Sequence, residues 1–374
     1  MKYKIRLTPL DWYFFGGEAT FGEGEGRRYF AKSNLLPQET AIIGMLRFEL
    51  LKANSLIPIT SGNKDVAIRK IGINGFNHKH KDENLSIGAI KSISPLFIEY
   101  QKCELLYKTP NNYDKELEFK KEGSVSLENY DYTFDGSEDK KFKTIPFIKG
   151  FSAKNYIPET WLSLKNGKEV AAYDEENQTS GIFKKKIKIG ITKQQEDRFD
   201  NNQDGYFKTE FCSLNSDYSF VVFADIEDDK IESDRLVYLG AERSMFKMEA
   251  EEIEKHEDVD YEKVEEEIKG NHRKNDSDTI ELFFISDAFV SSDILHLCKF
   301  AWFDTNPFRN IVRSVSENKN YSSLSRNEKS SRLNLIKRGS VLFFEASNEE
   351  AVLKQIDNPY LQNWGYNKYI KVNQ

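Results

Sequence analysis

The sequence predicts an α+β protein built from two ferredoxin-like units with long loop insertions, the arrangement shared by RNA-recognition domains. Strand patterns alternate with a few helical patterns, and this order occurs twice along the 374 residues. Each half can therefore supply a β-α-β-β-α-β unit. A chain of this length suffices for two ordinary domains, which we place at 1–214 and 215–374.

The first half opens with a strand, a long loop rich in glycine, and a helix. Residues 2–10 alternate, which places Tyr3, Ile5 and Leu7 on one buried face. Pro37 suits the first turn of a helix, and Gly44 would let that helix approach a sheet closely. The apolar residues that recur at helical spacing after Pro37 are Ile42, Ile43, Leu46 and Leu50.

Further strands are expected along the rest of the first half and just beyond it. Residues 93–107 predict a strand pair, and the polar stretch 108–145 predicts a long loop or insertion. Residues 181–191 alternate and predict a strand. The mostly apolar run at 218–226 is typical of a buried central strand.

The second half contains an acidic segment at about 245–275, interpreted as an exposed helix or a disordered insert. Strands are expected at 279–290, 339–346 and 365–372, and a helix within 291–302. Ser347 and Glu350 have the spacing of a capping box at the start of a last helix.

Composition limits the class of protein. The net charge is −7, so a nucleic-acid partner requires the basic groups to lie together on one face. The three cysteines are widely spaced, which predicts reduced thiols rather than disulfides or a metal site. No apolar run reaches the ~18 residues of a membrane helix, and the alternating N-terminus does not resemble a signal peptide. We therefore expect a cytoplasmic protein that does not bind membranes.

Basic residues accompany aromatic residues after the glycine loop at 22–28. Arg27, Arg28 and Lys32 flank Tyr29 and Phe30, and such pairs can clamp phosphates while a ring stacks on a base. The alternative is that both rings pack in the core. A nucleotide-binding glycine loop is disfavoured, because the loop stands about ten residues before the expected helix and carries two glutamates.

Two further basic segments are candidates for phosphate contact. Alternation places Lys184, Lys186 and Lys188 on one face of a strand. The stretch from 309 to 338 is expected to be a loop with few acids. Its cations are Arg309, Arg313, Lys319, Arg326, Lys329, Arg332, Lys337 and Arg338. Phosphate contact is the favoured interpretation, and ordinary surface salt bridges are the alternative.

No local motif predicts catalysis, a cofactor or a metal site. His78 and His80 have metal-ligand spacing, but lysines stand beside them and no residue completes the set. The sequence contains no nucleophile elbow, HExxH, Walker or kinase motif.

Several segments, in order, resemble the third subunit of the Cmr (type III-B) CRISPR effector complex, a family of the RAMP superfamily. The resemblance begins with a Leu-x-Pro-Leu-Asp strand end, a Phe-Phe turn and a Pro-x-x-Thr-x-x-Gly-x-Leu-Arg helix. These motifs are carried by Leu7, Pro9, Leu10, Asp11, Phe14, Phe15, Pro37, Thr40, Gly44, Leu46 and Arg47. Similar segments follow near 92–110, 187–211, 239–248 and 337–345. The chain departs from the pattern after Phe15 and at Lys188, where members often carry arginine.

The resemblance implies two packed ferredoxin-like domains without nuclease activity, which bind the repeat-derived 5′ handle of the guide RNA. It also implies docking to the large polymerase-like subunit and to the first backbone RAMP subunit. Near the handle we expect the cations Arg27, Arg28, Lys32 and Arg47. Further candidates are Lys184, Lys186, Arg243, Arg309, Arg313, Lys337 and Arg338.

Two other functions stay open. Some RAMP relatives are metal-independent endoribonucleases that process the guide-RNA precursor, and the histidines of this chain could meet in space. A scaffold that binds only proteins is the third hypothesis, with the acidic segment 249–267 as its main surface.

Overall fold

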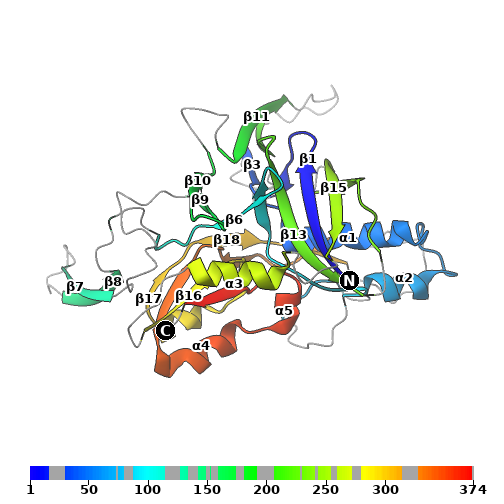
Figure 1. Ribbon diagram of the computed structural model, residues 1–374. Helices are drawn as coiled ribbons and strands as arrows, with labels where there is room; N and C mark the ends of the chain where they lie inside the picture. Colours follow the sequence, from blue (N-terminus) through cyan, green and yellow to red (C-terminus); the bar gives the residue numbers. More distant parts are fainter. Residues whose placement is uncertain are drawn as a thin grey trace, which may run out of the picture.

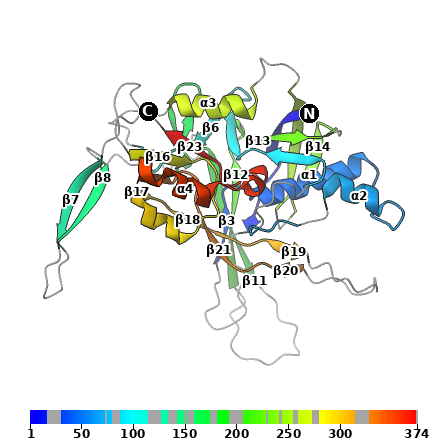
Figure 2. The ribbon, with the colours of Figure 1, turned by 90° about the horizontal axis from the view of Figure 1, so that it is seen from below.

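A computed structural model gives the arrangement of the chain (Figures 1 and 2). It describes residues 1–16, 30–72, 75–79, 87–113, 127–133, 142–148, 152, 159–173, 181–191, 206–227, 230–240, 243–253, 259–271, 279–313 and 327–372. The described part is an α+β protein with many strands and few helices, as the sequence predicts.

The largest sheet is organised around β1 (Lys2–Pro9), which pairs with β13 (Tyr218–Ile226) and β15 (Ser244–Glu252). All neighbours in this sheet are antiparallel. From one edge to the other the strands are β10 (Glu169–Ala171), β9 (Thr160–Ser163), β6 (Glu104–Lys108), β5 (Phe97–Tyr100), β13, β1, β15 and β14 (Arg235–Leu239); β4 (Ile90–Ile93) also pairs with β13.

Helix α1 (Glu39–Ala53) covers one face of this sheet. Its predicted apolar residues are all buried in one cluster with Tyr3, Ile5 and Leu7 of β1. Both elements therefore bury the faces that their periodicities predict. The short helix α2 (Lys64–Ile71) packs against the end of α1 through Ala67.

A second, four-stranded sheet is formed by residues after 278. Its order is β17 (Cys298–Trp302), β22 (Val341–Glu345), β16 (Thr279–Phe284) and β23 (Tyr369–Val372), with antiparallel neighbours. The 3₁₀ helix η1 (Ser292–Leu297) precedes β17. The short η2 (Ala346–Asn348), α4 (Glu349–Ile356) and α5 (Pro359–Asn363) precede β23.

The two sheets share a core, because Val221 and Phe223 of the first sheet pack in one cluster with Phe283 and Phe343 of the second. Helix α3 (Tyr261–Asn271) adds two buried residues to this cluster and lies against β23 (Figure 1). Helix α4 covers the opposite face of the second sheet. The halves are therefore joined by a continuous apolar interface.

Both sheets contain the same strand order. If β16, β17, β22 and β23 are counted as first to fourth, the sheet order is fourth, first, third, second. Counting β1, β5, β13 and β15 in the same way gives the same order. Helix α1 joins the first two of these strands, whereas β14 lies between the last two where the second sheet has helices.

A smaller sheet projects from one end of the molecule (Figures 1 and 2). Its order is β11 (Phe183–Ile191), β12 (Tyr206–Leu214), β3 (Phe30–Asn34) and β2 (Phe15–Gly16). A hairpin of β7 (Leu127–Thr133) and β8 (Phe142–Ile148) projects elsewhere. The remaining pairs are β18 (Thr305–Phe308) with β21 (Leu333–Ile336), and β19 (Ile311–Arg313) with β20 (Asn327–Lys329).

The structure differs from the sequence expectations in how segments are assigned to sheets. The change from the first sheet to the second falls between Glu252 and Thr279, not near 214, because β13 and β15 both pair with β1. Within the acidic segment, strand β15 and helix α3 bury apolar residues in the cores, so neither is a disordered insert. Parts of the polar stretch 108–145 and of the basic stretch 309–338 are paired strands.

Three local predictions are wrong. Gly44 lies on the exposed side of α1, and a Cβ there would meet no atom within 4 Å, so it does not serve a close approach to a sheet. Helix α4 begins at Glu349, and the Ser347 hydroxyl contacts Glu345 rather than forming a capping box. Cys298–Trp302 is a strand rather than helix, because it pairs with the exposed edge of β22.

Candidate nucleic-acid interface

Lysines occupy both faces of the projecting sheet. The register of β11 with β12 places Lys184, Lys186 and Lys188 on one face, as predicted from alternation. The pairing of β12 with β3 places Lys32 and Lys208 on the opposite face, together with Lys185. Both long faces of one small sheet therefore carry cations.

Several of these lysines lie over aromatic rings. The ammonium nitrogens of Lys186 and Lys188 lie 5.6 Å and 4.2 Å from the ring centroids of Trp12 and Phe211. On the other face, Lys32 lies 5.3 Å from the centroid of the Phe30 ring. This combination of exposed cations and rings suits a flexible, single-stranded polyanion, because rings can stack on bases while cations contact phosphates.

A cavity of about 350 Å³ lies beside the face of the sheet that carries Lys32 and Lys185. Its remaining wall comes from both halves of the chain, since it includes residues of the first sheet, the start of α1 and the turn before β22. The charged residues that line it are Lys32, Glu39, Lys108, Glu159, Lys185, Glu210, Asp287, Lys337 and Arg338. The cavity is therefore rich in charges of both signs.

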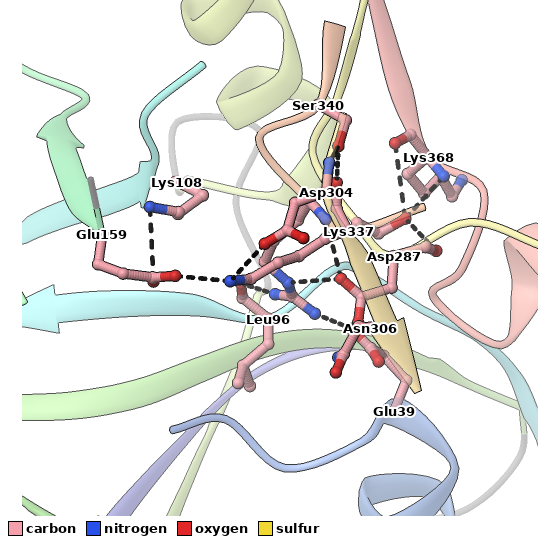
Figure 3. A network of polar contacts seen from close by, with 12 residues as sticks. Glu39, Leu96, Lys108, Glu159, Asp287, Asp304, Asn306, Lys337, Ser340 and Lys368 are labelled. Carbon is pink, nitrogen blue, oxygen red and sulfur yellow. Dashed lines mark hydrogen bonds and ion pairs between the residues drawn. The ribbon is translucent and has the colours of Figure 1, made fainter. Parts of the chain in front are cut away.

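Arg338 lines this cavity and joins the two halves, because its partners Glu39, Leu96 and Asp287, labelled in Figure 3, come from both of them. Its side chain is 5% exposed and donates to Glu39 at 2.5 Å, to Asp287 at 3.4 Å and to the Leu96 carbonyl at 3.1 Å. Burial lowers the pKa of Arg338, but Glu39 and Asp287 outweigh it, so the pKa is raised overall. Burial raises the pKa of Glu39 to about 7, although Arg338 opposes that shift. Arg338 thus has a structural ion-pair network around it.

A second ion-pair network lies on the cavity wall (Figure 3). The Lys337 ammonium is 2.6 Å from a Glu159 oxygen and 3.6 Å from Asp304, and Lys108 is 3.7 Å from the other Glu159 oxygen. Burial lowers the pKa of Lys108 to about 8, and Glu159 only partly opposes this effect. Despite burial, which raises it, the pKa of Glu159 is lowered by Lys108 and Lys337.

Of the predicted RNA contacts, Lys32, Lys337 and Arg338 come together at the cavity from distant parts of the sequence. Lys184 and Lys186 belong to the adjoining sheet. Arg27 and Arg28 lie outside the described residues, so the structure does not place the first predicted cluster as a whole.

The other predicted cations lie elsewhere. Arg47 is half-buried, with its guanidinium carbon 5.1 Å from the Trp364 ring centroid, and burial lowers its pKa to about 10. Arg243 is exposed at the turn between β14 and β15, with a φ of 51°. Arg309 is exposed after β18, and Arg313 lies in β19, with its side chain outside the described part.

Sequence reasoning missed Lys108 and Glu159. Lys108 ends an apolar strand, and Glu159 stands before another, so neither belongs to a basic or acidic run. Only the pairing of β6 with β9 brings them together. Among the described residues, no set of three or more histidine, cysteine, aspartate or glutamate side chains could hold a metal ion. No helix in that part of the chain is long and apolar enough to cross a membrane.

A sequence profile for a family of CRISPR-associated proteins, Cas_Cmr3, matches residues 5–373. The chain belongs to this family. The match confirms the resemblance to the type III-B Cmr subunit that the ordered motifs predicted. Cas_Cmr3 membership thus extends over nearly the whole chain, whereas no curated protein matches the sequence.

The chain is also similar to chains of solved structures. One is a cryo-EM structure of the type III-B Cmr-beta bound to cognate target RNA and AMPPnP, with 14% identity over 99% of this chain and 96% of that chain, and a TM-score of 0.47. Another is Cmr-beta bound to cognate target RNA, with 13% identity over the same shares and a TM-score of 0.46.

Proposed function

We propose that this chain is a non-catalytic subunit of a cytoplasmic type III-B effector complex that binds the 5′ handle of the guide RNA. In the same complex it docks the large polymerase-like subunit onto the backbone RAMP subunit. The observation that carries the proposal is the projecting sheet β11-β12-β3-β2, whose faces present lysines beside aromatic rings. Family membership supports the assignment to the complex and to a non-catalytic role.

Two ferredoxin-like domains are part of this proposal. The shared strand order of the two sheets supports them, because fourth-first-third-second with antiparallel neighbours is the order of a β-α-β-β-α-β unit. In the first unit the chain forms the edge strand β14 at the point in the sequence where the second helix would come. The projecting sheet is then an addition to the first unit.

Electrostatics explains how a chain of net charge −7 would bind RNA. Lysines gather on the projecting sheet, whereas α3 carries Glu262, Glu265, Glu266 and Glu267. Figure 2 shows β11 and α3 on opposite sides of the molecule, and the two elements are also drawn apart in Figure 1. Because exposed charges are largely screened beyond a Debye length of about 8 Å, the lysines nearest a phosphate chain, rather than the net charge of the protein, would determine its attraction to the sheet.

The test is binding of a repeat-derived 5′-handle RNA to the full chain with Lys184, Lys186 and Lys188 replaced by glutamine. We expect weaker binding, and a plot of log affinity against log salt that is flatter by about 0.7 for each lost phosphate contact. Fluorescence anisotropy at several salt concentrations measures both quantities.

A matched control neutralises three exposed lysines away from the projecting sheet, Lys91, Lys102 and Lys299. This variant has the same change in net charge, so it should lose little affinity if the projecting sheet is the interface. Equal losses in both variants would contradict the assignment. The processing-nuclease alternative is tested by incubating the chain with repeat RNA without metal, where discrete cleavage lost on replacing one histidine would favour it.

A further inference from the structure

Lys108, Glu159 and Lys337 form a cluster on the cavity wall. Its two lysines could bind an anion, but the Glu159 carboxylate already occupies the position between them. One carboxylate lies between two ammonium groups, with Glu159 oxygens 2.6 Å from Lys337 and 3.7 Å from Lys108. All three residues line the cavity. Lys108 is almost fully buried, and its ammonium also donates to the Thr160 carbonyl at 3.1 Å, so its position is fixed.

Glu159 can leave this position more easily than the lysines can. Its side chain is 38% exposed, so the carboxylate can turn toward solvent without being buried elsewhere. Its carbonyl accepts from the Ala172 N–H at 2.9 Å, so the backbone stays anchored during such a turn. The φ of Glu159 is 57°, a left-handed conformation that a residue with a Cβ adopts only when its surroundings hold it there.

Other residues that line the cavity have polar groups without a hydrogen-bond or ion-pair partner in the described part of the protein. Lys32 forms no ion pair with any described residue. The Trp161 indole nitrogen and the Tyr173 hydroxyl are buried without a hydrogen-bond partner in the described part of the chain. A ligand would reach these two buried atoms only after neighbouring side chains move, whereas Lys32 is exposed and can contact a ligand directly.

We propose that the cavity binds one nucleotide of the RNA, whose phosphate displaces the Glu159 carboxylate from Lys108 and Lys337. A volume of about 350 Å³ falls within the range of small-molecule sites and admits a single nucleotide rather than a duplex. Glu159 acts as an internal competitor that keeps the two lysines paired until the phosphate arrives. This inference rests on the proposed RNA-binding function and assigns a role to a residue of the opposite charge.

The decisive variant is Glu159→Gln in the full chain, titrated with adenosine 5′-monophosphate by calorimetry. Removing the competitor should tighten binding by about tenfold, the value of one charge-assisted hydrogen bond. Lys337→Gln should weaken binding by about tenfold for the same reason. If Glu159→Gln fails to fold, Glu159→Asp is the second variant. Its shorter side chain moves the carboxylate away from Lys108 and Lys337, so it should tighten binding by a smaller factor.

The matched control is the exposed pair Lys91 and Glu227, which does not line the cavity. Lys91→Gln and Glu227→Gln should leave nucleotide affinity unchanged. Unchanged or weaker binding by Glu159→Gln overturns the inference, because a purely structural ion pair gives that result. If handle RNA still responds to the β11 lysines, the proposed function survives that failure. If handle RNA binds neither the unmodified chain nor any variant, the proposed function is wrong instead.

Discussion

Replacing Arg338 with leucine tests whether the buried ion-pair network holds the two halves together. Arg338 lies between β21 and β22, whereas its partner Glu39 is the first residue of α1, 299 positions away. Its other partners are Asp287 and the Leu96 carbonyl. The variant removes every one of these contacts and leaves two carboxylates and a carbonyl in the interior.

The size of the effect follows from the burial of those acceptors. Glu39 is 1% exposed, and Asp287 is also buried. Breaking a buried ion pair by removing one partner costs about 3–5 kcal/mol, because an uncompensated charge remains. Domains are stable by only about 5–15 kcal/mol, so this loss is a large share of the total. The full effect is expected at pH 8, where Glu39 is mostly ionised given its pKa of about 7.

The assay is urea unfolding at pH 8, followed by circular dichroism and tryptophan fluorescence. The control is Arg235→Leu, which removes an arginine paired with Glu232 at the surface and should cost less than about 1 kcal/mol. Adding Glu39→Gln to Arg338→Leu should recover part of the loss, since one buried charge disappears. Equal small losses for both arginine variants would refute the argument.

Two other predictions concern buried charges. The pKa of Glu39 is raised from 4.5 to about 7 mainly by burial, so the folded chain holds a proton that the unfolded chain releases in this range. The free energy of unfolding should therefore fall as pH rises from about 4.5 to 7, and Glu39→Gln should flatten this dependence in urea titrations at several pH values. Arg47→Ala should lower stability by about 1–2 kcal/mol through loss of the Trp364 contact, and leave handle-RNA affinity unchanged. Lower affinity with unchanged stability would instead make Arg47 an RNA contact.

The spacing of apolar residues in the sequence correctly predicted the strands and helices that bury one face, such as β1 and α1. The alternation of Tyr3, Ile5 and Leu7 and the helical spacing after Pro37 identify the faces that pack together in the first core. Assignment to sheets could not be predicted in the same way. β1 pairs with β13, more than 200 residues later, and no local pattern encodes that partner. The predicted boundary near 214 therefore separated strands that share a sheet.

The sequence predicted the part of the candidate site that lies on one strand, but not the part that several distant elements form together. Runs of lysine mark β11 as basic, and the register confirms that Lys184, Lys186 and Lys188 share a face. Arg338 belongs to a basic run as well, but its buried partners come from other elements, and charge density in the sequence does not reveal them. Glu159 gave no signal, because its role depends on two lysines brought to it by separate strands.

The two networks at the cavity differ in a way that assigns them different roles. Arg338 and its partners Glu39 and Asp287 are buried. Replacing one of these charged side chains would leave the charge of another without its partner in the interior, which lowers stability. The Glu159 carboxylate beside Lys337 is partly exposed, so water can solvate it when it moves away from the lysine. The first network therefore fixes the relative position of the two halves. When a phosphate displaces the Glu159 carboxylate, the Arg338 contacts still hold that junction. RNA binding should therefore respond most to substitution of Lys337, and stability most to substitution of the neighbouring Arg338.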